Sequence, residues 1–298
     1  MQLHLFGAQT STGEALKRQL CSTHSVFPIF PYSRRNPSLL TADFRDPGAF
    51  HPGGEPSAPG LWISFGPIWL LAPFLERLAL ENPERLQGLR GVIACSSSSA
   101  ITKRFATNRF DRELVARLTT AEDQLVATCR RLELACCILR PTLIYGRVGP
   151  YVDRNLSRLI GLMRRLPLLP LPAHTGLRQP IHASQLAAVA LELVRQFATS
   201  GWDPQLPQRI ALGGDSKLSY AAMLRALQQS LPQTDPARRC RVLSLPTRLF
   251  YAAASPLLLQ SPKAFEAVLR MGSDLSGFTP AHQLLKAKPQ PFPVLPLL

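Results

Sequence analysis

Acidic residues are scarce in this sequence of 298 residues, which has 19 Asp and Glu against 34 Lys and Arg and a formal net charge of +15. Such a basic chain favours anionic ligands such as phosphates, or acidic surfaces. Nucleic acid is the rival partner, but the arginines are spread along the chain and no basic tract is interleaved with aromatic residues. We therefore expect no nucleic-acid binding and interpret the excess charge as a solvated basic surface.

The sequence also lacks long hydrophobic runs and Cys-x-x-Cys spacing. No stretch of about eighteen uncharged apolar residues occurs, and no basic leader with a cleavage site precedes the first apolar run. These absences predict a cytoplasmic protein. The six cysteines lie mostly within apolar patterns, so we expect free thiols and neither a disulfide nor a metal site. With 46% hydrophobic residues, the chain can bury a full core.

The segment LHLFGAQTSTG, residues 3–13, has the pattern of a strand, a tight turn and the start of a helix. Gly7 can adopt a positive φ, Gly13 allows the helix to pack closely on the strand, and the amides at a helix N-terminus favour a pyrophosphate. Thr10 stands where a middle glycine would be expected. The alternative is a purely structural turn, because any strand-to-helix connection tolerates glycine.

Strand-like and helix-like segments alternate through the first half of the chain. The patterns predict strands over 26–32, just before Asp43, and over 61–65, 91–95 and 134–139, with helices over 69–80 and from a cap at Asp111 to 132. This order predicts an α/β fold, a Rossmann-type doubly wound parallel sheet. We assign residues 1–150 to a dinucleotide-binding core and 151–298 to a mixed region that adds a small C-terminal substrate lobe and the remaining core elements.

Two arginines, Arg34 and Arg35, follow the second predicted strand, where a dinucleotide fold faces the adenosine ribose. Arginine there accommodates a 2′-phosphate, whereas an acidic residue would hold a 2′-hydroxyl. We therefore expect NADP(H) as cofactor, with NAD(H) as the alternative. The two arginines could also simply belong to a solvated surface loop. Asp43 and Phe44 follow the third strand, where Asp43 either accepts from an adenine amino group or caps a helix before Pro47.

Later motifs resemble a known family. Four serines, 96–99, follow the fifth strand, Ala121-Glu122 lies in the long helix, LRPTLIYG spans 139–146 and RQPIHASQLA spans 178–187. Together with GAQTSTG they resemble the extended short-chain dehydrogenase/reductase family, and within it the nucleoside-diphosphate-sugar epimerase and dehydratase branch, over almost the whole chain. The resemblance implies a core that holds NAD or NADP and a lobe that closes over a small, nucleotide-linked or otherwise anionic substrate.

The resemblance also implies which residues contact the cofactor. Arg34 and Arg35 would lie at the adenosine end, and Asp43 and Phe44 at the adenine. The pyrophosphate would lie against Gly7, Gln9, Thr12 and Gly13, the central part against Ser64, Phe65, Gly66 and Pro67, and the nicotinamide beside Pro141, Thr142 and Leu143.

On the substrate side, the resemblance implies that Ser98, or else Ser99, hydrogen-bonds the reacting oxygen. Arg178, with Asn155, would approach a substrate phosphate, because the forked guanidinium suits phosphate. The alternative for Arg178 is a surface ion pair. His182 would begin a helix and orient backbone.

The family's proton relay is missing. It consists of a tyrosine and a lysine four residues apart in the long helix, and counting back from Ala121-Glu122 places them at Leu114 and Leu118; no tyrosine in the chain is followed by lysine at this spacing. We expect these leucines to face the cofactor pocket and to keep it dry. The sequence thus predicts an atypical member that transfers hydride without the pair; the alternative is a non-catalytic, dinucleotide-binding regulatory or structural subunit.

The remaining segments are less specific. A helix is predicted over 153–165, and a loop or edge segment over 166–171. Residues 246–259 are apolar apart from Arg248, which favours a packed lobe helix, with peripheral membrane contact as the alternative. The proline-rich end, PQPFPVLPLL, is expected to lie extended across the surface. Neither substrate identity nor oligomeric state follows from the sequence.

Overall fold

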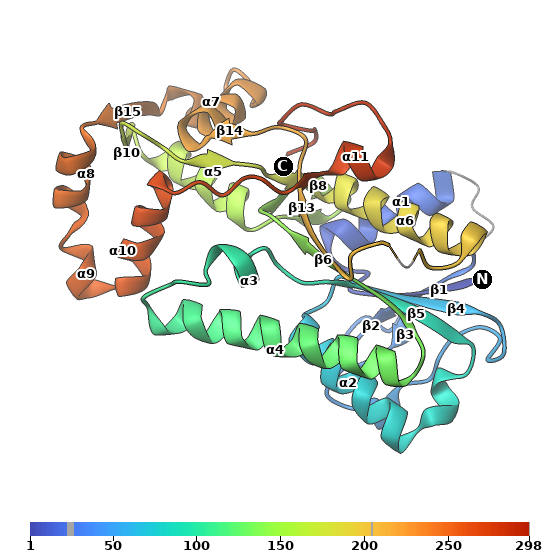
Figure 1. The fold of residues 1–298 in the computed structure, drawn as a ribbon. Helices are drawn as coiled ribbons and strands as arrows, with labels where there is room; N and C mark the ends of the chain where they lie inside the picture. The colour runs from blue at the N-terminus through green and yellow to red at the C-terminus, as the bar shows by residue number, and fades with distance from the viewer. Residues whose placement is uncertain (23–26, 204, 298) are drawn as a thin grey trace.

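The computed structural model describes residues 1–22, 27–203 and 205–297. An eight-stranded, wholly parallel sheet forms its centre, in the order β16-β13-β6-β5-β4-β1-β2-β3 (Figure 1). Its strands are β1 Gln2–Phe6, β2 Ile29–Ser33, β3 Leu40–Thr41, β4 Gly60–Ser64, β5 Leu89–Cys95, β6 Ala135–Pro141, β13 Arg209–Gly213 and β16 Thr279–Pro280. The predicted Rossmann-type sheet is confirmed; Val26, the predicted start of β2, lies outside the described residues.

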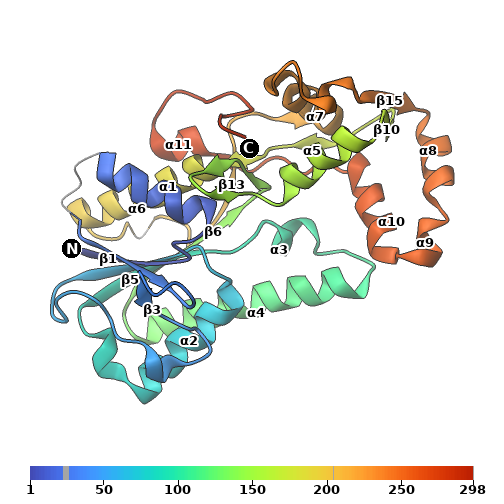
Figure 2. The ribbon, with the colours of Figure 1, turned by 180° about the vertical axis from the view of Figure 1, so that it is seen from behind.

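Helices cover both faces of this sheet (Figures 1 and 2). On one face lie α1 Ser11–Ser22, α6 Ala183–Ser200 and α11 Ala281–Leu285, and on the other α2 Ile68–Glu81 and α4 Arg109–Arg131. Each face has its own hydrophobic cluster. Because α6, β13, β16 and α11 come from the second half of the chain, that half completes the core as well as forming the lobe. The division at residue 150 stays a prediction.

The N-terminus of α4 differs from the prediction. The cap is Asn108, whose Oδ1 accepts the Asp111 backbone N–H at 2.8 Å. The Asp111 carboxylate is instead buried and accepts from Lys103 Nζ at 2.7 Å and from the Arg270 guanidinium at 2.6 Å. It therefore fastens the start of α4 to the lobe rather than capping the helix.

The lobe has its own cluster, built on Tyr145, Leu156, Ile160 and Leu224 among others. Its helices are α5 Asn155–Arg165, α7 Tyr220–Ser230, α8 Thr247–Ala254, α9 Leu257–Gln260 and α10 Pro262–Leu269, and β10 Leu168–Pro172 pairs in parallel with β15 Arg241–Leu245. Segment 166–171 thus contributes an edge strand. The single helix expected over 246–259 is wrong, because the chain breaks between α8 and α9 before Pro256. No helix in the described part of the chain is long and apolar enough to cross a membrane.

Short elements connect these parts. The two-residue strands are β7 Ile144–Tyr145 with β12 Ile181–His182, β8 Arg147–Val148 with β9 Tyr151–Val152, and β11 Leu177–Arg178 with β14 Leu218–Ser219. A single short turn of helix, α3 Ser99–Thr102, follows β5, and the 3-10 turns are η1 Pro47–Ala49, η2 Pro83–Leu86, η3 Pro236–Arg239 and η4 Arg270–Gly272.

The C-terminal segment lies along the surface of the lobe and is fastened there at a few points. Backbone amides of Gln290, Phe292 and Val294 donate to Asp215 Oδ2, Ser216 Oγ and Tyr145 Oη at 2.9, 2.9 and 2.8 Å. Phe292 and the buried Leu297 join the lobe cluster. The surface expectation holds for most of the segment, because residues 289–291, 295 and 296 are exposed; Leu297 is buried and Phe292 partly buried, and these two anchor the segment to the lobe.

Candidate cofactor site

The turn after β1 has the close packing that the sequence predicts. Gly7 has a φ of +77°, and a Cβ there would lie 2.9 Å from the carbonyl carbon of Phe65. A Cβ on Gly13 would lie 2.3 Å from the Gly7 carbonyl oxygen. Both positions therefore require glycine, and the turn leaves β1, β4 and α1 in close contact. Such a cradle suits the close backbone approach of a pyrophosphate.

Thr10, in place of the middle glycine, changes what this turn offers. Its Oγ1 donates to the Gly7 carbonyl at 2.8 Å and accepts the Gly13 N–H at 3.0 Å. The Thr10 hydroxyl thus caps the N-terminus of α1 and accepts the Gly13 N–H, which could otherwise donate to a bound anion. The side chain of Thr12, predicted to line the pyrophosphate, is buried.

A cavity of about 410 Å³ opens beside this turn, at the carboxyl ends of β1, β2, β3 and β4. Seven residues predicted for the cofactor line it: Gly7, Gln9, Arg34, Asp43, Phe44, Gly66 and Pro67. Sequence reasoning missed seven others: Phe6, Thr10, Tyr32, Ser33, Ala42, Arg45 and Leu70. Arg35, Thr12 and Gly13 are not among the lining residues.

Ser33 closes β2 and organises the arginine turn. Its Oγ donates to Gln9 Oε1 at 2.6 Å and accepts the backbone N–H groups of Arg35 at 3.2 Å and Asn36 at 3.1 Å. A neutral hydroxyl therefore stands where a carboxylate would bind a ribose 2′-hydroxyl. Its position at the end of β2 was the signal that could have identified it.

Asp43 and Phe44 form the opposite wall. Asp43 Oδ1 accepts the Arg45 N–H at 3.0 Å and so closes its own turn. The residue that precedes η1 is Asp46, and its side chain makes no capping hydrogen bond. The alternative of a helix cap at Asp43 is therefore wrong. The Phe44 ring lies 5.3 Å from the ring of Phe6 and 5.0 Å from that of Phe74, centroid to centroid. This packing gives the cavity a rigid aromatic floor.

Ser64 and Phe65, predicted for the central part of the cofactor, lie at the end of β4, and the three residues predicted for the nicotinamide lie at the end of β6; none of the five lines this cavity. Ser64 is buried, with Oγ accepting the Gly66 N–H at 3.3 Å, and Phe65 donates its N–H to the Phe6 carbonyl at 3.0 Å. Thr142 Oγ1 donates to the Gln179 carbonyl at 2.5 Å. Pro141 accepts the Ser98 N–H at 2.9 Å, and Leu143 packs against the lobe cluster.

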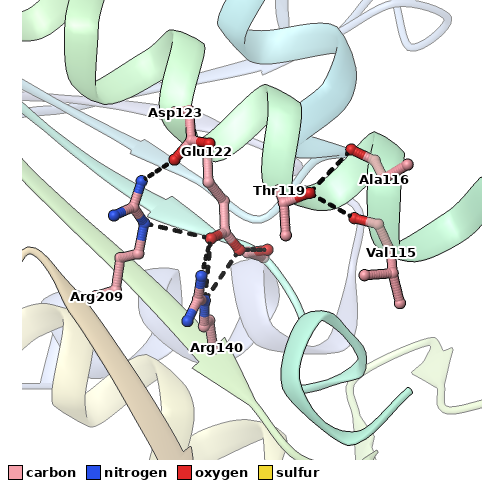
Figure 3. A network of polar contacts seen from close by, with 8 residues as sticks. Val115, Ala116, Thr119, Glu122, Asp123, Arg140 and Arg209 are labelled. Atoms are coloured by element: carbon pink, nitrogen blue, oxygen red, sulfur yellow. Dashed lines mark hydrogen bonds and ion pairs between the residues drawn. The ribbon is translucent and has the colours of Figure 1, made fainter. Parts of the chain in front are cut away.

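The serine run after β5 connects to a buried charge network (Figure 3). Ser96 Oγ donates to Glu122 Oε1 at 2.5 Å, and this fully buried carboxylate also accepts from Arg140 Nε at 3.1 and 3.0 Å. Arg209 Nε lies 3.4 Å from Glu122 Oε2 and its terminal nitrogen 2.5 Å from Asp123 Oδ1. The network fixes α4 against the ends of β5, β6 and β13.

The two candidate catalytic serines begin α3. Ser98 is its N-cap residue, and its carbonyl accepts the N–H groups of Ile101 and Thr102, both at 2.9 Å. The Ser99 N–H donates to Ser97 Oγ at 3.1 Å. Both serines are half-buried at the edge of the sheet where open α/β folds bind ligands. Their roles stay predictions.

Neither leucine at the relay positions lines the cavity. Leu118 is buried in the cluster between the sheet, α2 and α4, and Leu114 is half-buried against the same cluster. The expectation that both face the cofactor pocket therefore has no support in the described cavity. Neither position carries a group able to move a proton.

Arg178 has partners other than those expected. Its guanidinium is buried and donates to the carbonyls of Leu177 and Ser273, both at 2.7 Å, and to that of Arg270. It lies 5.1 Å from the Tyr220 ring centroid, and burial lowers the pKa of this guanidinium. The surface ion pair is therefore wrong. Asn155 begins α5 and is exposed, whereas the partners of Arg178 are Leu177, Tyr220, Arg270 and Ser273.

Comparisons with known proteins give the fold but no closer relationship. No protein-family model and no curated protein matches the sequence. A nucleoside-diphosphate-sugar epimerase from Staphylococcus aureus is similar in structure, with a TM-score of 0.58, 15% identity and 98% of each chain covered. The chain has the extended short-chain dehydrogenase/reductase fold.

Two further structures of this fold contain dinucleotides. UDP-glucose 4-epimerase from Bifidobacterium longum, in complex with NAD+ and UDP, has a TM-score of 0.63 at 11% identity over 97% of this chain and 94% of that one. Gre2 from Candida albicans, in complex with NADPH, has a TM-score of 0.61 at 12% identity over 98% and 95%. Of these two similar structures, one therefore holds NAD+ and the other NADPH.

Proposed function

We propose that the chain binds NADP(H), with the adenosine end in the cavity lined by Gly7, Arg34 and Phe44. The observation that carries this proposal is the charge of the cavity wall: Arg34 and Arg45 line it against a single carboxylate, Asp43, and the end of β2 has Ser33 in place of a carboxylate. A 2′-phosphate there would gain charge-assisted hydrogen bonds, whereas a bare ribose would find no carboxylate at that strand end.

The reaction we propose is hydride transfer to or from a small, nucleotide-linked or otherwise anionic substrate. The nicotinamide cofactor would supply or accept the hydride. Ser98, or Ser99, would hydrogen-bond the reacting oxygen, and water or the substrate would carry the proton. Hydride transfer depends on proximity and alignment, so it does not require a tyrosine-lysine relay. Ser64 and Phe65 would lie under the central part of the cofactor, and Pro141, Thr142 and Leu143 would lie beside the nicotinamide.

A second candidate is a non-catalytic module in which bound dinucleotide stabilises a regulatory or structural subunit. One observation favours it: Leu118, at the lysine position of the relay, is part of the hydrophobic core rather than of a ligand cavity.

Two measurements test these proposals. Native mass spectrometry of the purified protein, alone and with added NADPH or NADH, tests dinucleotide binding. Absorbance of bound NADPH followed over hours with a panel of carbonyl and nucleotide-sugar compounds tests hydride transfer. Binding with no oxidation of NADPH in any mixture would favour the non-catalytic module, and no binding of either dinucleotide would contradict both candidates.

A further inference from the structure

Large apolar side chains are exposed together at one end of the molecule. We call this end the lobe tip and define it as residues 103–113, a loop that leads into the first turn of α4, together with residues 247–272, which hold α8, α9 and α10. Phe105 is 90% exposed and Leu259 is 91% exposed, and Phe110 and Leu249 are each 64% exposed. Water-facing apolar surface of this kind is unfavourable unless another surface covers it.

Polar contacts join the two parts of the lobe tip. The Thr107 N–H donates to Glu266 Oε1 at 3.0 Å, and the Arg270 guanidinium lies 2.6 Å from Asp111 Oδ2. Tyr251 Oη donates to the Leu269 carbonyl at 3.4 Å and connects α8 to α10. Figures 1 and 2 show α9 and α10 beside the N-terminal end of α4, far from the chain's N-terminus. The exposed side chains of the loop and of the helices therefore lie at the same end.

The charge of the lobe tip is strongly positive. Residues 103–113 and 247–272 include seven Lys or Arg and three Asp or Glu. All three acidic residues have partners within this region: Asp111 pairs with Lys103 and Arg270, Glu113 pairs with Arg109, and Glu266 accepts from Thr107. Arg104 and Arg248 are exposed next to exposed apolar residues, and the Arg104 guanidinium carbon lies 5.7 Å from the Phe105 ring centroid.

We propose that the lobe tip docks on a lipid bilayer with anionic headgroups. Phe105, Phe110, Leu249 and Leu259 would enter the boundary between headgroups and acyl chains, and the arginines would contact headgroup phosphates. This pairing of apolar and basic side chains is that of peripheral membrane proteins. Nucleic acid offers phosphates but no apolar phase for Leu259. Because α8, α9 and α10 are each at most eight residues long, they rest in the interface and do not cross it.

Vesicle co-sedimentation tests the proposal with the full chain. Vesicles of phosphatidylcholine alone are compared with vesicles that also contain phosphatidylglycerol. We expect binding to the second kind only, weakening as salt is raised, because surface charges are screened. Phe105→Ser/Leu259→Ser should reduce the partition coefficient by about a hundredfold, roughly tenfold for each lost apolar side chain. Arg104→Gln/Arg248→Gln should reduce it by about twentyfold, roughly fivefold per charge.

Matched controls lie at other parts of the molecule. Leu80→Ser removes a 68% exposed leucine on α2, and Arg130→Gln/Arg131→Gln removes two exposed arginines at the opposite end of α4. Both should bind vesicles as the unaltered protein does. All variants are at exposed positions, so an unchanged thermal unfolding midpoint confirms folding. Equal binding to uncharged vesicles, no vesicle binding, or equal losses in the α2 and α4 controls would each overturn the proposal.

Discussion

Thr10 and Gly13 share a hydrogen bond inside the turn that would face a pyrophosphate: the Gly13 N–H donates to Thr10 Oγ1 at 3.0 Å. Thr10→Gly should release this amide and tighten NADPH binding about tenfold, since a hydrogen bond to a charged group contributes about 1.5 to 3 kcal/mol. Because glycine is itself an acceptable N-cap residue, loss of the hydroxyl should lower the unfolding free energy by only about 0.3 kcal/mol. Calorimetric titration and urea unfolding measure the two effects. Thr10→Ser keeps the hydroxyl and should change neither, and an affinity unchanged in Thr10→Gly would contradict this role.

Arg34 and Arg35 should differ in their effect on cofactor choice, because only Arg34 lines the cavity. We expect NADPH to bind about ten- to a hundredfold more tightly than NADH. Arg34→Gln should remove most of this preference, while Arg35→Gln keeps it. Titration of both dinucleotides into each variant measures it, and equal affinities in the unaltered protein would disprove the NADP(H) proposal.

His4 should make the protein sensitive to mild acid. Burial lowers its pKa from 6.5 to about 4, and its Nδ1 lies 3.0 Å from Tyr32 Oη, which accepts the Gly53 N–H. As the pH falls, the His4 imidazole is therefore protonated first in the unfolded state. The part of the unfolding free energy that His4 contributes above pH 6.5 is lost as the pH falls towards 4. The loss should reach about 3 kcal/mol, following the 1.36 kcal/mol per pKa unit. Urea unfolding at several pH values measures it. His4→Gln should flatten the curve between these limits, and a curve of unchanged slope would refute the assignment.

Glu122 should be the most sensitive position of the network in Figure 3. Glu122→Gln leaves Arg140 and Arg209 without their buried counter-charge, and removal of one partner of such a pair costs about 3 to 5 kcal/mol. Asp123→Asn removes the exposed partner of Arg209 and should lower the unfolding free energy by less than about 1 kcal/mol. Urea unfolding compares the two variants, and equal losses would show that the network contributes little beyond a surface pair.

Ser98 should affect turnover without affecting cofactor affinity. If hydride transfer occurs, Ser98→Ala should lower kcat roughly a hundredfold, in line with the loss of one oxyanion donor. The dissociation constant of NADPH should stay unchanged. Ser99→Ala is the matched control, with a smaller effect. Turnover indifferent to both substitutions would rule out the assigned role of the serine run.

Much of the fold was predictable because its signals are local. Apolar runs, Gly7 and Gly13 define the first strand, turn and helix, and His182 begins α6 as expected, with Ser184 N–H donating to its Nδ1. The cap of α4 was not predictable, because Asn108 and Asp111 are both good caps and only the backbone path selects one. Arg178 was misjudged because its carbonyl partners at 270 and 273 lie more than ninety residues away.

Part of the candidate site was also predictable, because some of its residues have local sequence signals. Arg34 and Phe44 follow recognisable strands, whereas Ser33 and Arg45, directly beside them, carried no separate motif. The residues predicted for the nicotinamide lie at the end of β6, and there Leu143 packs against the lobe cluster, a contact between distant segments that no local sequence pattern specifies. The positions of Leu114 and Leu118 were identified by counting along α4, but their surroundings follow from the packing of α2 against α4.

The contacts Thr107–Glu266 and Asp111–Arg270 each join residues 159 apart in the sequence. Closing so long a loop lowers the conformational entropy of the chain before the contact is formed. Proteins with many contacts between distant residues therefore fold slowly. Docking of α10 on the start of α4 is therefore expected to be a late event in refolding. A fluorescent probe on this end of the molecule would report a slower phase than a probe on α1.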